Sequence, residues 1–210
     1  IQFIAIDELT PSIRAYRKAV PTPSIDRIAA QGTTFLNAHC QQAVCGPSRA
    51  SAMTGKYPDF TQIWDLKTKI RAIHPEIITL TQHFKNNGFH TAGVGKIFDP
   101  RSVDKGADTR SWSEAYTQIW HLKYNKKTGK PIGHYHNSKS KTLAAEDKNA
   151  NWSAINKKLF ANDAWPVIEA LDVPDDAYDD GAIAAHAVKS LAKLAKKKKP
   201  FFLAVGFKNA

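Results

Sequence analysis

The sequence contains little of what several specialised folds require. Only two of its 210 residues are cysteines, so it has no disulfide framework of the kind that holds small secreted domains together. No apolar run reaches the length of about 18 residues that a membrane-spanning helix needs. No internal repeat occurs, and MTGK at Met53–Lys56 lacks the rest of a phosphate-binding loop. What remains is a globular domain, and a hydrophobic content of 42% is enough for one sizeable core.

Acidic residues are scarce relative to basic ones. Lysine and arginine number 30 against 19 aspartates and glutamates, which gives a formal net charge of +11. This balance suits polyanions such as an anionic polysaccharide, a nucleic acid or a membrane surface. It is equally explained by a lysine run at a predicted helix end, Lys196–Lys199, and by lysines scattered through 123–158. Because no nucleic-acid-binding motif accompanies the charge, we expect neither nucleic acid nor a membrane as a partner.

Short apolar runs alternate with segments of helical pattern along the chain. Strands are predicted at 1–6, 33–39, 89–98 and 200–207, and helices at 22–32, 47–54, 79–88 and 179–197. Ser24 is the predicted N-cap of the first of these helices, and the first strand is predicted to be buried. The alternation predicts an α/β fold with a mostly parallel central sheet and helices on both faces. Acidic Asp7 and Glu8 follow the first strand, at the sheet edge where ligands of such folds bind.

The chain is predicted to form the N-terminal part of a single domain, 1–210. It opens on the strand-like run IQFIAI without a methionine and closes just after PFFLAVGF, so we expect a fragment of a longer protein whose C-terminal half is absent. The stretch 101–162 is rich in lysine and aromatic residues and shows no clear period. We interpret it as an insertion or surface excursion within that domain.

Cys45 begins the most informative stretch, CGPSRASAMTGKYP. It lies just before the helix predicted at 47–54, whose N-terminus presents free N–H groups and partial positive charge to an anion. Arg49 follows about one turn later, where its guanidinium can hold two oxygens of a tetrahedral anion. A nucleophile and two anion-binding features therefore lie close together. Two alternatives stay open from the residues alone, a small buried thiol and a disulfide with Cys40.

The same stretch resembles the sulfatase signature, in which Cys-x-Pro-Ser/Ala-Arg is followed a few residues later by Thr-Gly. Further segments similar to this family follow in the family's order and cover nearly the whole chain: IAIDELTPSIRAY, TPSIDRIAAQGTTFLNAHCQQAVCGPSR, QHFKNNGFHTAGVGKIFDP, SWS, ALDVP and PFFLAVGF. The likeness is greatest to the iduronate-2-sulfatase-like branch of the formylglycine-dependent type I sulfatases. It implies an incomplete alkaline-phosphatase-like sulfatase fold, of which this chain is the N-terminal half or less.

The resemblance also implies a reaction and its cofactors. In this family a formylglycine-generating enzyme recognises the motif and oxidises its cysteine to formylglycine (3-oxoalanine). One hydroxyl of the hydrated aldehyde, activated by a divalent metal such as Ca²⁺, attacks the sulfur of a sulfate ester. Loss of the other hydroxyl's proton then expels sulfate. The expected substrate is a sulfated sugar or polysaccharide, as in glycosaminoglycan degradation, and the expected location is periplasmic, secreted or lysosome-like.

Residues of the sulfatase site match positions of this chain. Asp7 and Glu8 match the metal carboxylates, with the modified Cys45 as a further ligand. Arg49 matches the arginine that stabilises the formylglycine, and Lys96 matches the lysine that contacts the sulfate. The expected catalytic residues are Cys45, Arg49, Lys96 and Asp99, and the expected substrate-binding residues are Lys96, Lys69 and Asn209.

Several of these positions depart from the family pattern. Glu8 stands in place of a second aspartate, and Asp99 stands where near relatives carry a histidine that positions or deprotonates the formylglycine hydroxyl. Asn209 and Ala210 replace a Lys-Pro pair, and Lys208 compensates only if the strand end is bulged. The departures leave open a non-catalytic homologue that binds sulfated glycans. A phosphatase or phosphodiesterase relative is a third alternative, although such enzymes usually use serine or threonine as the nucleophile.

Overall fold

The computed structural model of the chain describes residues 1–16, 20–122, 124–125, 130–131, 136–146, 152–165 and 168–208. In chain order its strands and α-helices are β1 (Gln2–Ile6), α1 (Pro23–Gln31), α2 (Cys45–Thr54), α3 (Pro58–Thr61), α4 (Ile70–Ile73), α5 (Leu80–Asn86), β2 (His90–Gly95), α6 (Ile119–Leu122), β3 (Tyr124–Asn125), β4 (Lys130–Pro131), α7 (Ser138–Ala145), α8 (Trp152–Ala161), α9 (Asp179–Ala195) and β5 (Phe201–Phe207). Short 3-10 turns cover Arg14–Tyr16, Asp104–Gly106 and Thr109–Ser111. Within these ranges no helix has the length and apolar character needed to cross a membrane.

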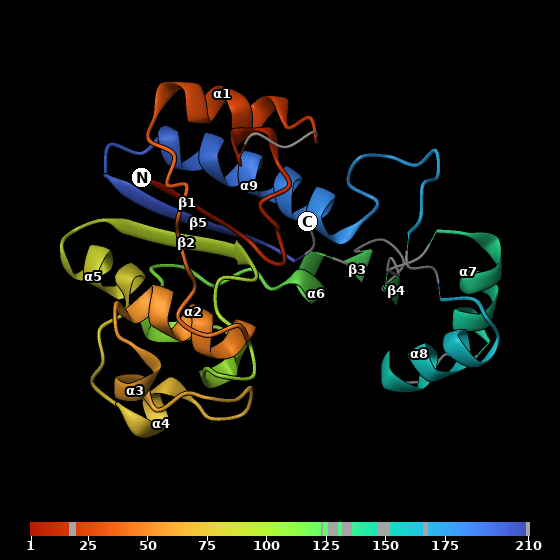
Figure 1. Cartoon of the computed structure of the whole chain (residues 1–210), viewed down its shortest axis with the longest axis horizontal. Coiled ribbons are helices and arrows are strands. Elements are labelled where there is room, and N and C mark those ends of the chain that lie inside the picture. The colour runs from red at the N-terminus through yellow and green to blue at the C-terminus, as the bar shows by residue number, and fades with distance from the viewer. Residues whose placement is uncertain are drawn as a thin grey trace.

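β1, β5 and β2 form a three-stranded parallel sheet in that order, as predicted (Figure 1). β5 lies between the two earlier strands, and its Val205 is opposite both Ile4 of β1 and Val94 of β2. All three strands point the same way, so the residues that follow them meet at one end of the sheet. β3 and β4 form a separate antiparallel pair.

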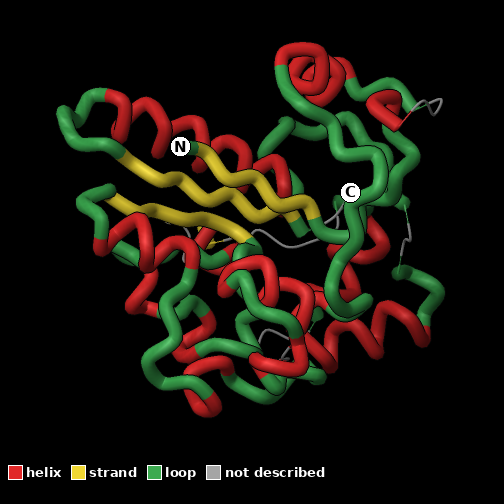
Figure 2. The backbone as a smooth tube through the Cα atoms, turned by 60° about the vertical axis from the view of Figure 1, so that its left-hand side comes forward, coloured by secondary structure: helices red, strands yellow, loops and turns green. Residues whose placement is uncertain are grey.

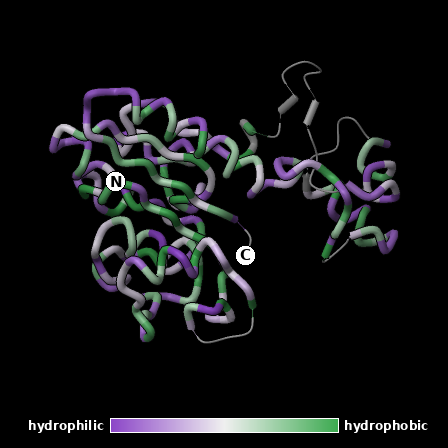
Figure 3. The backbone as a smooth tube through the Cα atoms, turned by 90° about the horizontal axis from the view of Figure 1, so that it is seen from above, coloured by the Kyte–Doolittle hydropathy of each residue, from purple (hydrophilic) through white to green (hydrophobic). Residues whose placement is uncertain are grey.

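Helices cover both faces of this sheet, which confirms the predicted layers (Figures 1 and 2). The alternation of side chains along β5 builds the two cores. Phe202 and Ala204 pack on one side with residues of α2 and α5, where the ring of Phe84 stacks 4.6 Å from that of Phe202. Leu203 and Val205 pack on the other side with α9. Hydrophobic segments accordingly run along the strands in Figure 3.

Three local predictions are wrong. The strand expected at 33–39 is a loop, and its Phe35 is 72% exposed; β5 already has a neighbouring strand on each side, and this loop joins no ladder among the described residues. β1 is an edge strand, so its Ile4 is 52% exposed instead of buried. α1 is capped at Thr22 and not at Ser24, because Pro23 takes a position in the first helical turn, where a missing N–H costs nothing.

α2 also begins two residues earlier than predicted, at Cys45. Val44 is its extended N-cap, and the N–H of Ser48 donates to Val44 O at 3.0 Å. Pro47 lies in the first turn, where N–H groups have no partner within the helix, so it does not interrupt the helix. Cys45 therefore belongs to the first turn of α2, and Gly55 ends the helix with a left-handed φ of 66°.

The stretch 101–162 starts inside the main core. Val103 and Trp112 are each 4% exposed and pack in the same core as α2, and the indole Nε1 of Trp112 donates to Ala107 O at 2.6 Å. α7 and α8 lie apart from the sheet in Figures 1 and 3, and Leu159 of α8 is fully buried. The described residues around Trp112 thus belong to the core, and an insertion remains a prediction for the later part of this stretch.

Candidate active site

The ends of β1 and β2 bring an acidic and a basic residue together. Asp7 directly follows β1 and Lys96 directly follows β2, and the Lys96 ammonium forms an ion pair with Asp7 Oδ2. Glycines make this approach possible. A Cβ on Gly206 of β5 would collide with the carbonyl oxygen of Lys96, and one on Gly95 would collide with that of Gly206. Without side chains at these positions, the Lys96 N–H donates to Gly206 O at 2.7 Å.

Arg49 fixes the other oxygen of the same carboxylate. Its Nη2 lies 3.1 Å from Asp7 Oδ1, and its Nη1 donates to the carbonyls of Lys96 and Ile97, the latter at 3.1 Å. Burial alone would raise the pKa of Asp7, but the hydrogen bond from Lys96 and the charge of Arg49 outweigh it and lower that pKa. The Asp7 carboxylate is therefore ionised and is held between two cations from different parts of the chain.

Cys45 contacts Asp99 directly. The Sγ of Cys45 donates to Asp99 Oδ2 at 3.1 Å, and Asp99 is 1% exposed. Burial raises the pKa of the Cys45 thiol, and the hydrogen bond to Asp99 raises it further against the opposing charge of Lys96. For Asp99, burial is outweighed by hydrogen bonds from Arg101 and Cys45, which lower its pKa to about 2. The pair is thus a neutral thiol and an ionised carboxylate.

Arg101 is the site residue that the sequence analysis missed. Its Nε donates to Asp99 Oδ1 at 2.9 Å and its Nη2 to Asp99 Oδ2 at 2.8 Å, and the same Nη2 lies 3.7 Å from Cys45 Sγ. Asp99 could have indicated Arg101 from the sequence, because a carboxylate buried in this position needs a nearby cation. A residue two positions further along a turn can supply that cation.

Lys69 and Lys208 are not joined to this cluster. Lys69 pairs its ammonium with Asp104 Oδ1 at 3.3 Å, and both side chains are about half exposed. Lys208 follows β5, but its Nζ lies 3.4 Å from Asp179 Oδ2 at the start of α9, so it does not compensate for the missing lysine in the way that a bulged strand end would allow. Asn209 and Ala210 lie outside the described residues.

The divalent cation implied by the family is only partly matched by the described residues. They contain no group of three or more His, Cys, Asp or Glu side chains that could hold a metal ion. Asp7 fits as one carboxylate ligand because it is ionised, although Arg49 and Lys96 each bind one of its oxygens. Glu8 is exposed with a left-handed φ of 60°, and its side chain makes no hydrogen bond or ion pair with the described residues. A complete coordination shell needs donors from outside this set.

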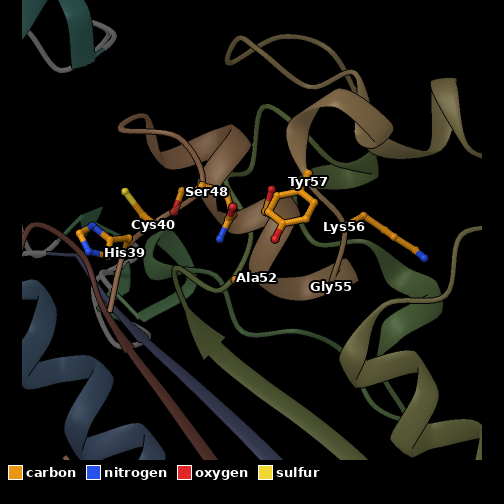
Figure 4. A pocket seen from close by; sticks show the side chains of 9 residues that line it. His39, Cys40, Ser48, Ala52, Gly55, Lys56 and Tyr57 are labelled. Carbon is orange, nitrogen blue, oxygen red and sulfur yellow. The ribbon is translucent and has the colours of Figure 1, made fainter. Parts of the chain in front are cut away.

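A hollow of about 540 Å³ lies beside α2 (Figure 4). His39, Cys40, Ser48 and Tyr57 are among the residues that line it, whereas Cys45 and its partners are not. Cys40 is exposed, and both cysteines are free thiols, so the disulfide alternative is not realised in this structure. The cluster around Cys45, and not this hollow, joins a cysteine to an ion-paired carboxylate, because Asp99 contacts both Cys45 and Arg101.

The comparison with a known protein family identifies the class to which this fold and site belong. The family model described as Sulfatase matches residues 3–209, and the chain belongs to the sulfatase family. Iduronate 2-sulfatase of Mus musculus and that of Homo sapiens are each 35% identical to it over 208 residues, which is 99% of this chain and 34% of the relative. The chain therefore spans about a third of the length of these curated relatives.

Solved structures confirm the predicted fold. The crystal structure of Ps i-CgsB in complex with k-i-k-neocarrahexaose superimposes with a TM-score of 0.64 at 23% identity, over 100% of this chain and 44% of that one. The structure of BT4656 in complex with its substrate D-glucosamine-2-N,6-O-disulfate gives 0.58 at 18% identity, over 99% and 33%. The parallel sheet and its helices are those of an alkaline-phosphatase-like sulfatase.

Proposed function

We propose that the protein to which this chain belongs hydrolyses sulfate esters of a sulfated sugar or polysaccharide, with a formylglycine made from Cys45 as the nucleophile. One observation carries the proposal. In a chain of the sulfatase family, the Cys45 Sγ lies at the first turn of α2 and contacts an ionised carboxylate, Asp99, at 3.1 Å. Iduronate 2-sulfatase, to which the chain is similar over nearly its whole length, is by its name a sulfatase of a sugar acid.

The state of the thiol counts against unmodified Cys45 as the nucleophile. Only the thiolate of a cysteine is a good nucleophile, and here burial and Asp99 raise the pKa of the Cys45 thiol. An unmodified Cys45 is therefore a weak nucleophile in this position, and it lacks the second hydroxyl that expels sulfate. A formylglycine-generating enzyme is the proposed maturation partner, acting on the CGPSR motif.

In the proposed reaction the Cys45 Sγ stands in for an oxygen of the hydrated formylglycine. That oxygen bonds to the sulfate sulfur as the bond from sulfur to the sugar oxygen breaks, and the proton lost by the attacking hydroxyl goes to the sugar oxygen, which leaves as an alcohol. Asp99, ionised and in contact with position 45, then accepts the proton of the second hydroxyl. The aldehyde carbonyl re-forms as the bond between the residue 45 carbon and the sulfate oxygen breaks, sulfate leaves, and Asp99 returns its proton to solvent. Water adds to the aldehyde and restores the starting diol.

The remaining charges position the reacting groups. Arg49 and Lys96 hold Asp7 at the end of the sheet and place two positive charges beside the path of the anionic sulfate. Asp7 and Glu8 would hold a divalent cation, Ca²⁺ by the donor type, together with further ligands. When bound, this ion supplies Lewis-acid activation of the attacking oxygen. We further propose a periplasmic, secreted or lysosome-like location, on the strength of the family alone.

Mass spectrometry and sulfate release test the function together. The full-length protein is produced with and without a formylglycine-generating enzyme, the peptide that contains Cys45 is weighed, and free sulfate is measured with sulfated mono- and oligosaccharides. We expect conversion of Cys45 and sulfate release only with the enzyme present, and a Cys45→Ala variant serves as the inactive control. Full conversion without sulfate release from any sulfated sugar would favour the non-catalytic, glycan-binding alternative instead.

A further inference from the structure

Arg101 is the site cation that faces solvent. In the described part of the chain, the cations that contact Asp7 or Cys45 are Arg49, Lys96 and Arg101. The side chains of Arg49 and Lys96 are 10% and 18% exposed, and both are bound to Asp7. The Arg101 side chain is 55% exposed. A ligand that arrives from solvent therefore meets the guanidinium of Arg101 before it meets the other two cations.

The position of this guanidinium is fixed. Asp99 Oδ1 accepts from the backbone N–H of Arg101 at 3.0 Å and from its Nε at 2.9 Å, and Asp99 Oδ2 accepts from its Nη2 at 2.8 Å. Pro100 between them restricts the backbone of the turn, and Asp99 itself is 1% exposed. Arg101 is therefore held along one edge by a buried carboxylate, unlike a surface arginine that samples many rotamers.

Within the ranges that the structure describes, the N–H donors of Nη1, on the other edge of the guanidinium, are free to bind a ligand. Because Nε and Nη2 are taken by Asp99, Nη1 lies on the opposite side, and it makes no hydrogen bond with the described residues. Nη2 lies 3.7 Å from Cys45 Sγ, the atom that stands in for the attacking oxygen. A sulfur atom ready for attack lies about 3–3.5 Å from the nucleophile. The oxygens on such a sulfur are then within reach of the Arg101 donors.

We propose that Arg101 binds an oxygen of the substrate's sulfate group through its Nη1 edge, while Asp99 holds its Nε and Nη2 edge. The inference rests on the proposed function, which supplies the sulfate ester. It also accounts for the charge of the site. Asp99 places a negative charge where an anion must bind, and the positive charge of Arg101 cancels it. The remaining charges are those of Arg49, Lys96 and Asp7, which sum to one positive charge. Arg101 is thus assigned as a substrate-binding catalytic residue.

Calorimetric binding of inorganic sulfate tests this proposal without turnover. The full-length protein with unmodified Cys45 is compared with Arg101→Gln, which keeps a polar side chain but removes the charge. Arg110→Gln is the matched control, because the Arg110 side chain is 53% exposed and pairs with Glu76 at the surface. We expect Arg101→Gln to weaken sulfate binding roughly tenfold or more, as for the loss of a hydrogen bond to a charged group. The control is expected to stay within about twofold.

A second variant keeps the test decisive if Arg101→Gln does not fold. Arg101→Lys keeps the charge but not the planar fork, and we expect it to bind sulfate more weakly than the parent by several fold. Sulfate affinity unchanged by either folded substitution overturns the proposal, as does a parent protein that does not bind sulfate. Binding of glucuronate that depends on Arg101 more strongly than binding of sulfate also overturns it, since a sugar carboxylate is then the ligand.

The outcome is separable from that of the proposed function. Sulfate binding that depends on Arg101 in a protein that never releases sulfate from sugars supports this inference and counts against hydrolysis. Release of sulfate from sugars by a protein whose sulfate binding does not depend on Arg101 supports hydrolysis and counts against this inference.

Discussion

The Sγ of Cys45 lies 3.1 Å from Oδ2 of Asp99, so the proposed nucleophile position and a buried carboxylate are in direct contact. This contact joins the first turn of α2 to the turn after β2. It makes the protonation of one residue depend on the charge of the other. The first two predictions rest on that dependence.

Replacement of Asp99 by asparagine is expected to make the Cys45 thiol more reactive. Next to burial, the hydrogen bond to Asp99 is the main cause that raises the pKa of this thiol, and an amide carries no negative charge. The pKa should fall and the rate of alkylation by iodoacetamide near pH 7.5 should rise several fold. The measurement uses unmodified protein with Cys40→Ser, so that Cys45 alone reports. An unchanged or slower rate in Asp99→Asn would contradict the prediction.

Asp99 is also expected to make stability depend on pH at the acid end. Its pKa in the folded protein is about 2, below the ordinary value of 3.8, so its contribution is fully present above about pH 4 and is lost as the pH falls towards 2. The shift corresponds to about 2 kcal/mol. Urea unfolding between pH 2 and 7 should show a shallower acid slope in Asp99→Asn than in the parent. A surface variant, Asp59→Asn, should keep the parent's slope.

Loss of one partner of the buried ion pair between Arg71 and Asp108 is expected to lower the free energy of unfolding strongly. The two side chains are 8% and 3% exposed, Arg71 Nη2 donates to Asp108 Oδ2 at 3.0 Å, and a second hydrogen bond joins Arg71 Nε to Oδ1. Asp108→Ala would leave a buried guanidinium without its carboxylate and should destabilise the protein by about 3–5 kcal/mol in urea unfolding. Asp104→Ala breaks the half-exposed pair with Lys69 and should cost less than about 1 kcal/mol. Equal losses of unfolding free energy in Asp108→Ala and Asp104→Ala would contradict the predicted difference between the buried and the exposed ion pair.

Gly206 is expected to tolerate no side chain. An added Cβ collides with backbone atoms of Lys96, which cannot move without shifting the end of β2 away from Asp7. Gly206→Ala should therefore lower the thermal unfolding midpoint and weaken sulfate binding. Gly88→Ala is the control: a Cβ there meets open space, and the cost is limited to the left-handed φ of 87°. Similar behaviour of the two variants would show that the close approach of β2 and β5 is not required.

The sequence was sufficient to predict much of this site. Asp7 and Lys96 each follow an apolar run, and the parallel arrangement of those strands brings their ends together. The helix after Cys45 and the cation at Arg49 were likewise visible as a local pattern. The segment 33–39 was misjudged because an apolar run alone does not show whether a neighbouring strand is available to pair with it.

By itself, the sequence determined the family and the α/β layers and led to the proposal of Cys45 as the nucleophile position, because strand and helix periodicity and the CGPSR motif are local properties of the chain. Only the tertiary structure decided which charges surround that position. It placed Arg101 on Asp99 beside Cys45, and it paired Lys69 and Lys208 with other acids. The physical reason is that an ion pair depends on distance and burial between side chains far apart in sequence, which no local pattern encodes.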